Sequence, residues 1–383
     1  MGPLAGVRVI EMAGLGPAPL CGMLLADLGA EVVLVDRSRE MVATRRIDPI
    51  YRNRRGIALN LKNPAGIEVL LGLAAKADIL IECFRPGVME RLGAGPDACL
   101  ARNPRLVYGR MTGWGQDGPL ARSAAHDINY LALTGLLHQI GPVGGRPVPP
   151  EYFVGDFGAG GAMLAIGVLA ALTAARVSGR GQVVDAAIVD GAIAMMGVLY
   201  ALRGTPLVRD ATGENYLAGA APWYDTYATK DGRYVSVGAL EPQFFGLLLD
   251  RLGLDRGRWA PLGFPNVGDE ARREWPALRA AMAAAFASRT RDEWCGILEG
   301  SDACFAPVLS MAEAPGHPHN VARGSFIEVD GVLQHAPAPR FSGTPPGPVR
   351  PPPAAGADTD AVLRDGGWRD DQIAALRDAG ALD

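Results

Sequence analysis

The chain has 383 residues, of which 49% are hydrophobic and 20% are charged, and its formal net charge is −4 at pH 7. These values are typical of a globular protein and exclude a disordered chain, and the acidic balance argues against a nucleic-acid partner. The length exceeds what one ordinary core accommodates, so two domains are expected.

The first half of the sequence alternates predicted strands with predicted helices. Strands are expected at 7–11, 31–36, 56–60, 79–82 and 106–110, and helices at 17–28, 65–76, 88–92 and 96–102. Such alternation predicts an α/β fold with a doubly wound, Rossmann-like parallel sheet, which binds ligands at the carboxyl ends of its strands.

The second half predicts a smaller α+β domain and a return to the first. Helices are expected at about 126–140 and 157–176, then a strand at 183–186, and the smaller domain contributes a strand at 233–237 and helices at 242–252, 276–287 and 291–298. A proline-rich extended segment, 336–356, precedes two short helices at 359–363 and 370–378. The predicted division is a large domain at 1–204, a linker at 205–226, a small domain at 227–320 and a segment at 321–383 that completes the large domain.

The cysteines and apolar segments bear on the compartment. Five cysteines are scattered without a paired framework or a metal-binding spacing, which is typical of a reducing compartment. No basic-then-apolar leader opens the sequence, and the most apolar run, 162–175, is shorter than the roughly 20 residues that span a bilayer. The sequence therefore predicts a cytoplasmic protein without a membrane partner and without a bound metal.

The first strand–helix turn, Gly14-Leu15-Gly16, resembles a dinucleotide-binding loop, and Asp36 follows at a suitable distance. The third glycine of that motif is replaced by Pro19, and prolines at 17 and 19 remove backbone N–H groups that a pyrophosphate needs. A proline in the first helical turn is the better interpretation, so no nicotinamide or flavin cofactor is expected.

Arginines gather in the first quarter of this mildly acidic chain. Such a cluster suits a phosphorylated ligand, because guanidinium groups bind phosphate oxygens in a bidentate manner, although solvated surface arginines explain it equally well. The cluster comprises Arg37, Arg45, Arg46, Arg52, Arg54, Arg55, Arg85 and Arg91.

Two polar residues at predicted helix starts are candidates for proton transfer. His126 stands in the first turn of its helix, where the helix dipole disfavours the imidazolium and favours a neutral base, with Tyr130 one turn further on. Asp156 precedes three glycines and is either a helix N-cap or an acid beside N–H groups that stabilise an oxyanion. Glu241, just before Pro242 and another helix, is a weaker candidate on its own.

Taken together, six segments resemble the family III CoA-transferases, in particular the racemase branch of that family, and their order covers nearly the whole chain. They are Leu80–Gly93, Met111–Pro119, His126–Tyr130, Gly179–Asp185, Gly238–Phe244 and Pro337–Ser342.

The resemblance implies proton transfer at C2 of a 2-methylacyl-CoA, with CoA as part of the substrate and no separate cofactor. It implies an interlocked homodimer whose active site lies between the large domain of one subunit and the small domain of the other. His126, assisted by Glu241, and Asp156 would be the two acid–base groups. The implied contacts to CoA and substrate are Arg37, Leu59, Asn60, Leu61, Lys62, Cys83, Phe84, Arg85, Arg91, Ala125, Asp127, Ile128, Asn129 and Tyr130.

Three residues depart from the family pattern, and two other functions remain open. Asn60, Cys83 and Ala125 replace the usual residues and are expected to alter contacts with CoA, and the acyl chain itself is undetermined. One alternative is a CoA-transferase in which Asp156 attacks an acyl-CoA and forms an anhydride. The other is a CoA-binding protein without catalysis.

Overall fold

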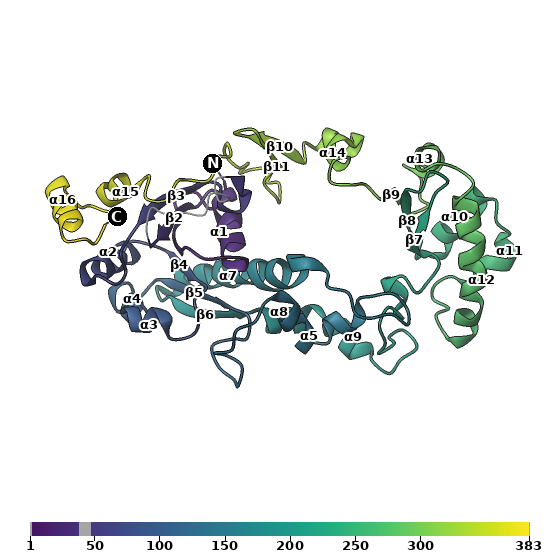
Figure 1. Ribbon diagram of the computed structural model, residues 1–383, viewed down its shortest axis with the longest axis horizontal. Coiled ribbons are helices and arrows are strands. Elements are labelled where there is room, and N and C mark those ends of the chain that lie inside the picture. The colour runs from purple at the N-terminus through teal and green to yellow at the C-terminus, as the bar shows by residue number, and fades with distance from the viewer. Residues whose placement is uncertain (1, 38–46, 383) are drawn as a thin grey trace. The chain divides into compact units, whose positions relative to one another are not determined.

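The computed structural model describes residues 2–37 and 47–382, which form two compact units (Figure 1). The first unit contains residues 1–134, 151–195 and 324–383, and the second contains 135–150 and 196–323. The C-terminal segment belongs to the first unit, as expected. The division differs from the expected one because 135–150 and 196–204 group with the second unit, and so does the expected linker 205–226.

The first unit is built on a six-stranded, wholly parallel sheet. Its order, β3-β2-β1-β4-β5-β6, is that of a doubly wound fold, and the direction of winding changes between β1 and β4. The strands are β1 (Arg8–Met12), β2 (Glu31–Asp36), β3 (Arg54–Ala58), β4 (Ile79–Glu82), β5 (Val107–Thr112) and β6 (Gln182–Ala187).

Helices cover both faces of this sheet because consecutive side chains of its buried strands are apolar, as in Val32–Val35 of β2. One face, with Ile10, Val33, Ile57 and Leu80, packs against a group of helices near both ends of the chain. These helices are α2 (Pro64–Ala74), α3 (Val88–Leu92), α4 (Pro96–Arg102), α15 (Thr359–Asp365) and α16 (Asp370–Asp378). The other face is covered by α1 (Pro17–Asp27) and α7 (Met163–Ser178).

The remaining elements of the first unit position the candidate site or close its edges. They are η2 (Pro49–Tyr51), α5 (Asp127–Leu133), η3 (Glu151–Phe153), the π-helix η4 (Val154–Ala162), α8 (Ile188–Met195), β10 (Phe326–Val329) and β11 (Val332–His335). The edge strand β3 is covered by the returning chain, since Asp358 N–H donates to Gly56 O at 2.9 Å. The hairpin β10–β11 lies just before the expected extended segment 336–356, in a stretch for which no strand was predicted.

The second unit has its own core around a three-stranded antiparallel sheet, in the order β7-β8-β9. Its largest buried side chains are aromatic, among them Trp223, Phe245 and Phe286. The elements are α6 (Leu136–Gln139), α9 (Gly197–Leu202), η5 (Tyr216–Ala218), β7 (Tyr224–Ala228), β8 (Tyr234–Gly238), α10 (Pro242–Leu252), α11 (Arg256–Trp259), η6 (Ala260–Leu262), α12 (Asp269–Phe286), α13 (Arg291–Leu298), β9 (Phe305–Pro307), η7 (Ala314–Gly316) and α14 (Pro318–Arg323).

Three expected boundaries are wrong for local reasons. The helix expected at 126–140 is two helices, because Gly135 takes a left-handed conformation (φ 74°) and interrupts it. The helix expected at 276–287 begins at Asp269 and contains Pro276 in its interior, so that proline does not mark its start. Strand β7 lies partly within the expected linker.

The chain from Glu151 to Ser178 is one continuous helical segment of 28 residues, and its most apolar 18-residue window has a mean hydropathy of 1.8. By length and composition it could cross a membrane, which corrects the expectation based on the shorter run 162–175. In the structure 44% of that window is buried, and α7 packs on β5 and β6. Core helices of globular proteins pass the same test, so the segment is weak evidence for a membrane span.

Candidate active site

The loops after β1 and β4 meet where the winding of the sheet changes direction. A Cβ on Gly14 would lie 2.1 Å from Cys83 Sγ, so the glycine is required for this close approach. Burial raises the pKa of the Cys83 thiol to about 12, and the thiol is therefore neutral at pH 7. Cys83 holds the two loops together and is not a nucleophile here.

Most residues expected to contact CoA follow the carboxyl ends of neighbouring strands. Arg37 follows β2, the stretch Leu59–Lys62 follows β3, and Cys83–Arg85 follows β4, so all three lie at one edge of the sheet. Arg37, Asn60, Lys62 and Arg85 are exposed. The side chain of Leu59 is fully buried and that of Phe84 packs on the core, so these two residues can contact a ligand mainly through their backbone.

The arginine cluster separates into structural and available members. Arg54 is buried and uses its guanidinium on Glu11 and on the carbonyl oxygens of Pro19, Ile50 and Arg52, at 2.5–3.2 Å. Arg52 is likewise buried against Asp27. Arg55 pairs with Glu31 and Asp365, while Arg45 and Arg46 lie outside the described residues. Only Arg37, Arg85 and Arg91 remain as exposed ligand candidates.

Two of these candidates line a cationic pocket of about 510 Å³ next to β4. Arg85 and Arg91 are joined there by Arg110 and Arg122, neither of which was a sequence candidate. Arg110 is held by Glu82 at 3.1 Å and by Glu90 at 2.8 Å. The pocket is rich in guanidinium donors and suits phosphate groups.

The expected segment Ala125–Tyr130 forms the start of α5. His126 is the exposed residue that precedes the helix, and its N–H donates to Asn129 Oδ1 at 3.1 Å. The Tyr130 hydroxyl donates to Ala125 O at 2.7 Å, and its ring stacks edge-on against Trp114. Ile128 points outward and is 41% exposed. These contacts fix the loop that presents the imidazole.

Asp156 is not an N-cap, which corrects one of the two interpretations of this residue. It is the third residue of the π-helix η4, and its carboxylate lies toward the loop after β1, because a Cβ on Gly16 would lie 3.0 Å from Asp156 Oδ2. Burial and the charge of Asp127 raise the pKa of Asp156 to about 6, although His126 opposes the shift. His126 and Asp156 therefore lie close enough to interact electrostatically.

Asp127 accepts hydrogen bonds from backbone N–H groups in the first turn of η4, as an N-cap side chain would. Its Oδ1 accepts the N–H of Asp156 at 2.6 Å, and the N–H of Gly155 also donates to this carboxylate. A Cβ on Gly155 would lie 2.1 Å from the same oxygen, so position 155 requires glycine. Asp127 thus anchors η4 to α5, and its burial raises its own pKa. Its sequence position next to His126 gave no indication of this contact.

The later glycines of η4 allow close packing against neighbouring helices. A Cβ on Gly161 would lie 2.5 Å from Pro17 O, and one on Gly160 would lie 3.0 Å from Pro17 Cβ. Gly158 is close to Met195 Cε. These glycines bring η4 against α1 and α8, and the expectation that they also admit a substrate carbonyl stays a prediction.

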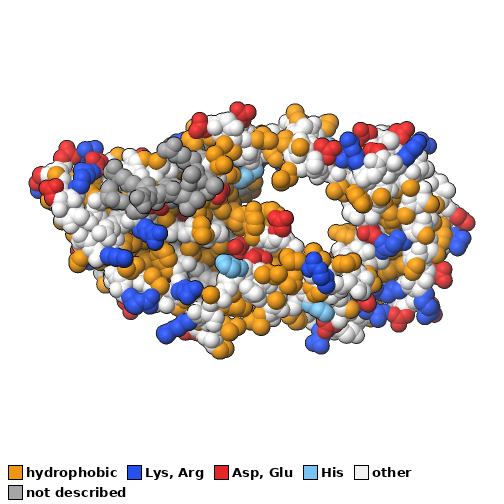
Figure 2. All heavy atoms as spheres, viewed as in Figure 1, with side chains coloured by type: hydrophobic (Ala, Val, Ile, Leu, Met, Phe, Trp, Pro, Cys, Tyr) orange, Lys and Arg blue, Asp and Glu red, His pale blue; other side chains and the backbone are white. Residues whose placement is uncertain are grey.

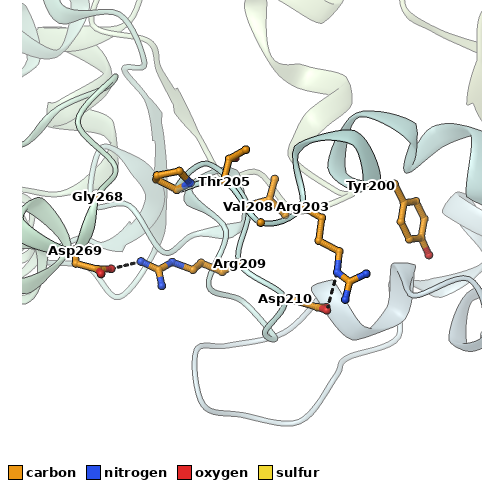
Figure 3. A pocket seen from close by; sticks show the side chains of 10 residues that line it. Tyr200, Arg203, Thr205, Val208, Arg209, Asp210, Gly268 and Asp269 are labelled. Atoms are coloured by element: carbon orange, nitrogen blue, oxygen red, sulfur yellow. Dashed lines mark hydrogen bonds and ion pairs between the residues drawn. The ribbon is translucent and has the colours of Figure 1, made fainter.

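Glu241 belongs to the second unit. It is the residue before Pro242 at the start of α10, is exposed, and makes no capping hydrogen bond with its side chain. A pocket of about 790 Å³ also lies in this unit, and Figure 3 shows two of its arginines facing acidic partners. Arg203 pairs with Asp210 at 3.4 Å and Arg209 pairs with Asp269. None of the candidate residues lines it.

The architecture, the strand-end site and the sequence agree on a family. The chain belongs to CoA-transferase family III, whose pattern matches residues 4–359. Within that family it is 44% identical over 376 residues to alpha-methylacyl-CoA racemase of Mus musculus, covering 97% of this chain and 96% of that protein. The racemase of Homo sapiens is 41% identical over 375 residues, with the same coverage.

Solved structures agree with the fold. A CAIB/BAIF family protein from Brucella suis superimposes with a TM-score of 0.79 at 26% identity, covering 95% of this chain and 99% of that one. The fold and the family predicted from the sequence are confirmed.

Proposed function

We propose that the chain is an alpha-methylacyl-CoA racemase, which interconverts the 2R and 2S epimers of 2-methylacyl-CoA thioesters. The observation that carries the proposal is the carboxyl of Asp156, which lies beside the loop after β1, interacts electrostatically with His126 and has a pKa raised to about 6. Near neutral pH such a carboxyl is present in both protonated and ionised forms, as a group that both donates and accepts protons must be.

The reaction needs one base and one acid on opposite faces of C2. In one direction, neutral His126 removes the C2 proton and the C2–H electron pair moves into the thioester to form an enolate. Protonated Asp156 then delivers its proton to the other face of C2. The reverse direction uses the opposite protonation states, and exchange of these protons with solvent labels C2 in heavy water. CoA enters as part of the substrate, and the proposal includes no separate cofactor.

The enolate oxygen requires hydrogen-bond donors, because the C2 proton of a thioester is only weakly acidic. The N–H groups of Gly155 and Asp156 already donate to Asp127. The first N–H groups of a helix have no hydrogen-bond partner within that helix. We therefore assign the N–H groups of Asp127 and Ile128, at the start of α5, as the donors to the enolate oxygen. We assign the cationic pocket around Arg85 and Arg91 to the phosphates of CoA.

Incubation of one epimer of a 2-methylacyl-CoA in heavy water tests this function. We expect deuterium at C2 together with the other epimer, and at least about a thousandfold loss of both in Asp156→Asn and His126→Ala. If C2 stays unlabelled and CoA passes to an added carboxylic acid, the protein is a transferase. If neither occurs while CoA still binds, catalysis is excluded.

We further propose a cytoplasmic homodimer whose active site is shared between subunits, which would unite His126 and Asp156 of the first unit with Glu241 of the second. Mixing two inactive variants, His126→Ala and Glu241→Ala, tests it. A heterodimer with shared sites contains one site with both residues intact, so activity should return on mixing. No recovery after verified subunit exchange would place each site within one chain.

A further inference from the structure

Three aromatic side chains surround the position of Asp156 in the sequence and pack against one another. The ring centroids of Tyr152 and Phe153 are 4.7 Å apart, and those of Tyr152 and Phe157 are 4.9 Å apart in an edge-to-face arrangement. Phe153 and Phe157 are 6.4 Å apart, also edge-to-face. Tyr152 stands one helical turn before Asp156, so this aromatic cluster begins beside the carboxyl group.

Two of these rings are left in solvent. Tyr152 is 47% exposed and Phe153 is 56% exposed, although large aromatic side chains gain more than most from burial. Phe157 is less exposed, and its ring contacts both of the exposed rings. The core of the unit therefore does not need Tyr152 and Phe153.

The exposed rings continue into an apolar surface formed by the neighbouring helices. Leu133 on α5 is 65% exposed, and Ile193 and Met195 on α8 are 46% and 55% exposed. Both helices pack on η4, and a Cβ on Gly158 would lie 3.4 Å from Met195 Cε. Figure 2 shows hydrophobic side chains gathered over α5 and α8, with acidic and histidine side chains among them. Contiguous exposed apolar surface of this kind marks a binding site.

We propose that Tyr152 and Phe153 form the surface that receives the group attached to C2 of the substrate, and that they favour a flat ring there over a linear alkyl chain. The inference rests on the proposed function, because it takes Asp156 as the group that meets C2. Tyr152 stands one helical turn before Asp156, so the inference takes atoms one or two bonds beyond C2 to pass over these rings.

The preference for a ring follows from the geometry of the surface. Aromatic rings gain about 0.5–1.5 kcal/mol from edge-to-face and offset contacts beyond the area they bury. A linear chain on the same surface gains area alone and loses more rotational freedom. Two such rings therefore predict a preference of roughly tenfold for a 2-aryl over a 2-alkyl substrate of similar size.

Variants that keep the apolar volume but remove the rings test the proposal. The ratio of kcat/KM for 2-phenylpropanoyl-CoA to that for 2-methyloctanoyl-CoA is measured in Tyr152→Leu, Phe153→Leu and the double variant. We expect the ratio to fall about three- to fivefold in each single variant and about tenfold in the double variant. Val177→Ala, which removes an 88% exposed apolar side chain of α7, is the control and should leave the ratio unchanged.

A binding measurement separates this inference from the proposed function. Thioesters with two methyl groups at C2 have no proton to transfer, so their dissociation constants report the surface alone. An aryl-to-alkyl affinity ratio that falls in the double variant supports the surface even if the wild type transfers no proton. Ratios that do not change in folded variants overturn it. The proposal is also overturned if the double variant loses affinity equally for the aryl and alkyl thioesters and its oligomer dissociates. The rings would then form a contact between subunits.

Discussion

Two regions of the first unit remove carboxylates from water beside the same sheet. They differ in whether a cation compensates the negative charge. In one region, Glu11 of β1 pairs with Arg54 of β3 and both side chains are fully buried, so each charge has a partner. At the start of η4, the carboxylate of Asp127 accepts the Asp156 N–H, its charge adds to the effect of burial, and the pKa of Asp156 rises to about 6. A balanced pair holds the fold, whereas an unbalanced pair keeps a proton available for exchange.

The largest effect is expected where the balanced pair is broken. Arg54→Leu leaves Glu11 buried without its cation and should lower the free energy of unfolding by about 3–5 kcal/mol, measured by urea denaturation. Arg55→Leu, at a partly exposed ion pair one residue further on, should cost no more than about 1 kcal/mol. Equal losses in the two variants would remove the distinction between the buried pair and a surface pair.

The same comparison applies to the arginines that have no structural role. Arg91→Met should leave stability unchanged but weaken CoA binding about tenfold, because the exposed guanidinium lines the cationic pocket. Calorimetric titration with CoA measures the loss, which should shrink as salt is added. Arg180→Met, at an exposed arginine outside this pocket, is the control. Unchanged affinity in Arg91→Met would leave the pocket without a role in binding.

A carboxyl whose pKa is raised makes the folded state less stable when it ionises. Asp156 binds its proton more tightly in the folded chain than in the unfolded chain, so stability falls as the pH rises from about 4 to about 6. Asp156→Asn removes this loss. Since the group is partly exposed, we expect a gain of about 1 kcal/mol at pH 8 and none near pH 4, by urea denaturation. A variant less stable than the wild type at pH 8 would contradict this origin of the shift.

The sequence was sufficient for the order of βα units and for the strand ends that carry Arg37, Asn60 and Arg85, because apolar periodicity and turn residues are local. It could not assign Arg54, because its partner Glu11 is 43 residues away and only the fold brings them together. The packing role of Gly160 and Gly161 was missed for the same reason, since their neighbour Pro17 is distant in the sequence. The hydrogen bond that the Asp156 N–H donates to Asp127 likewise depends on tertiary packing.

The smallest effect tests whether the two carboxyls are coupled. Asp127→Asn keeps an oxygen that accepts the Asp156 N–H but removes the charge, which is the second contribution to the raised pKa after burial. The pKa of Asp156 should therefore fall, and the pH at which its acid form is lost in the kcat/KM profile should drop by about half a unit. Asp127→Ala removes the acceptor as well, so it should lower kcat at every pH. If the pH profile of kcat/KM is the same in Asp127→Asn as in the wild type, burial alone raises the pKa of Asp156. Asp127 would then act only as the anchor of η4.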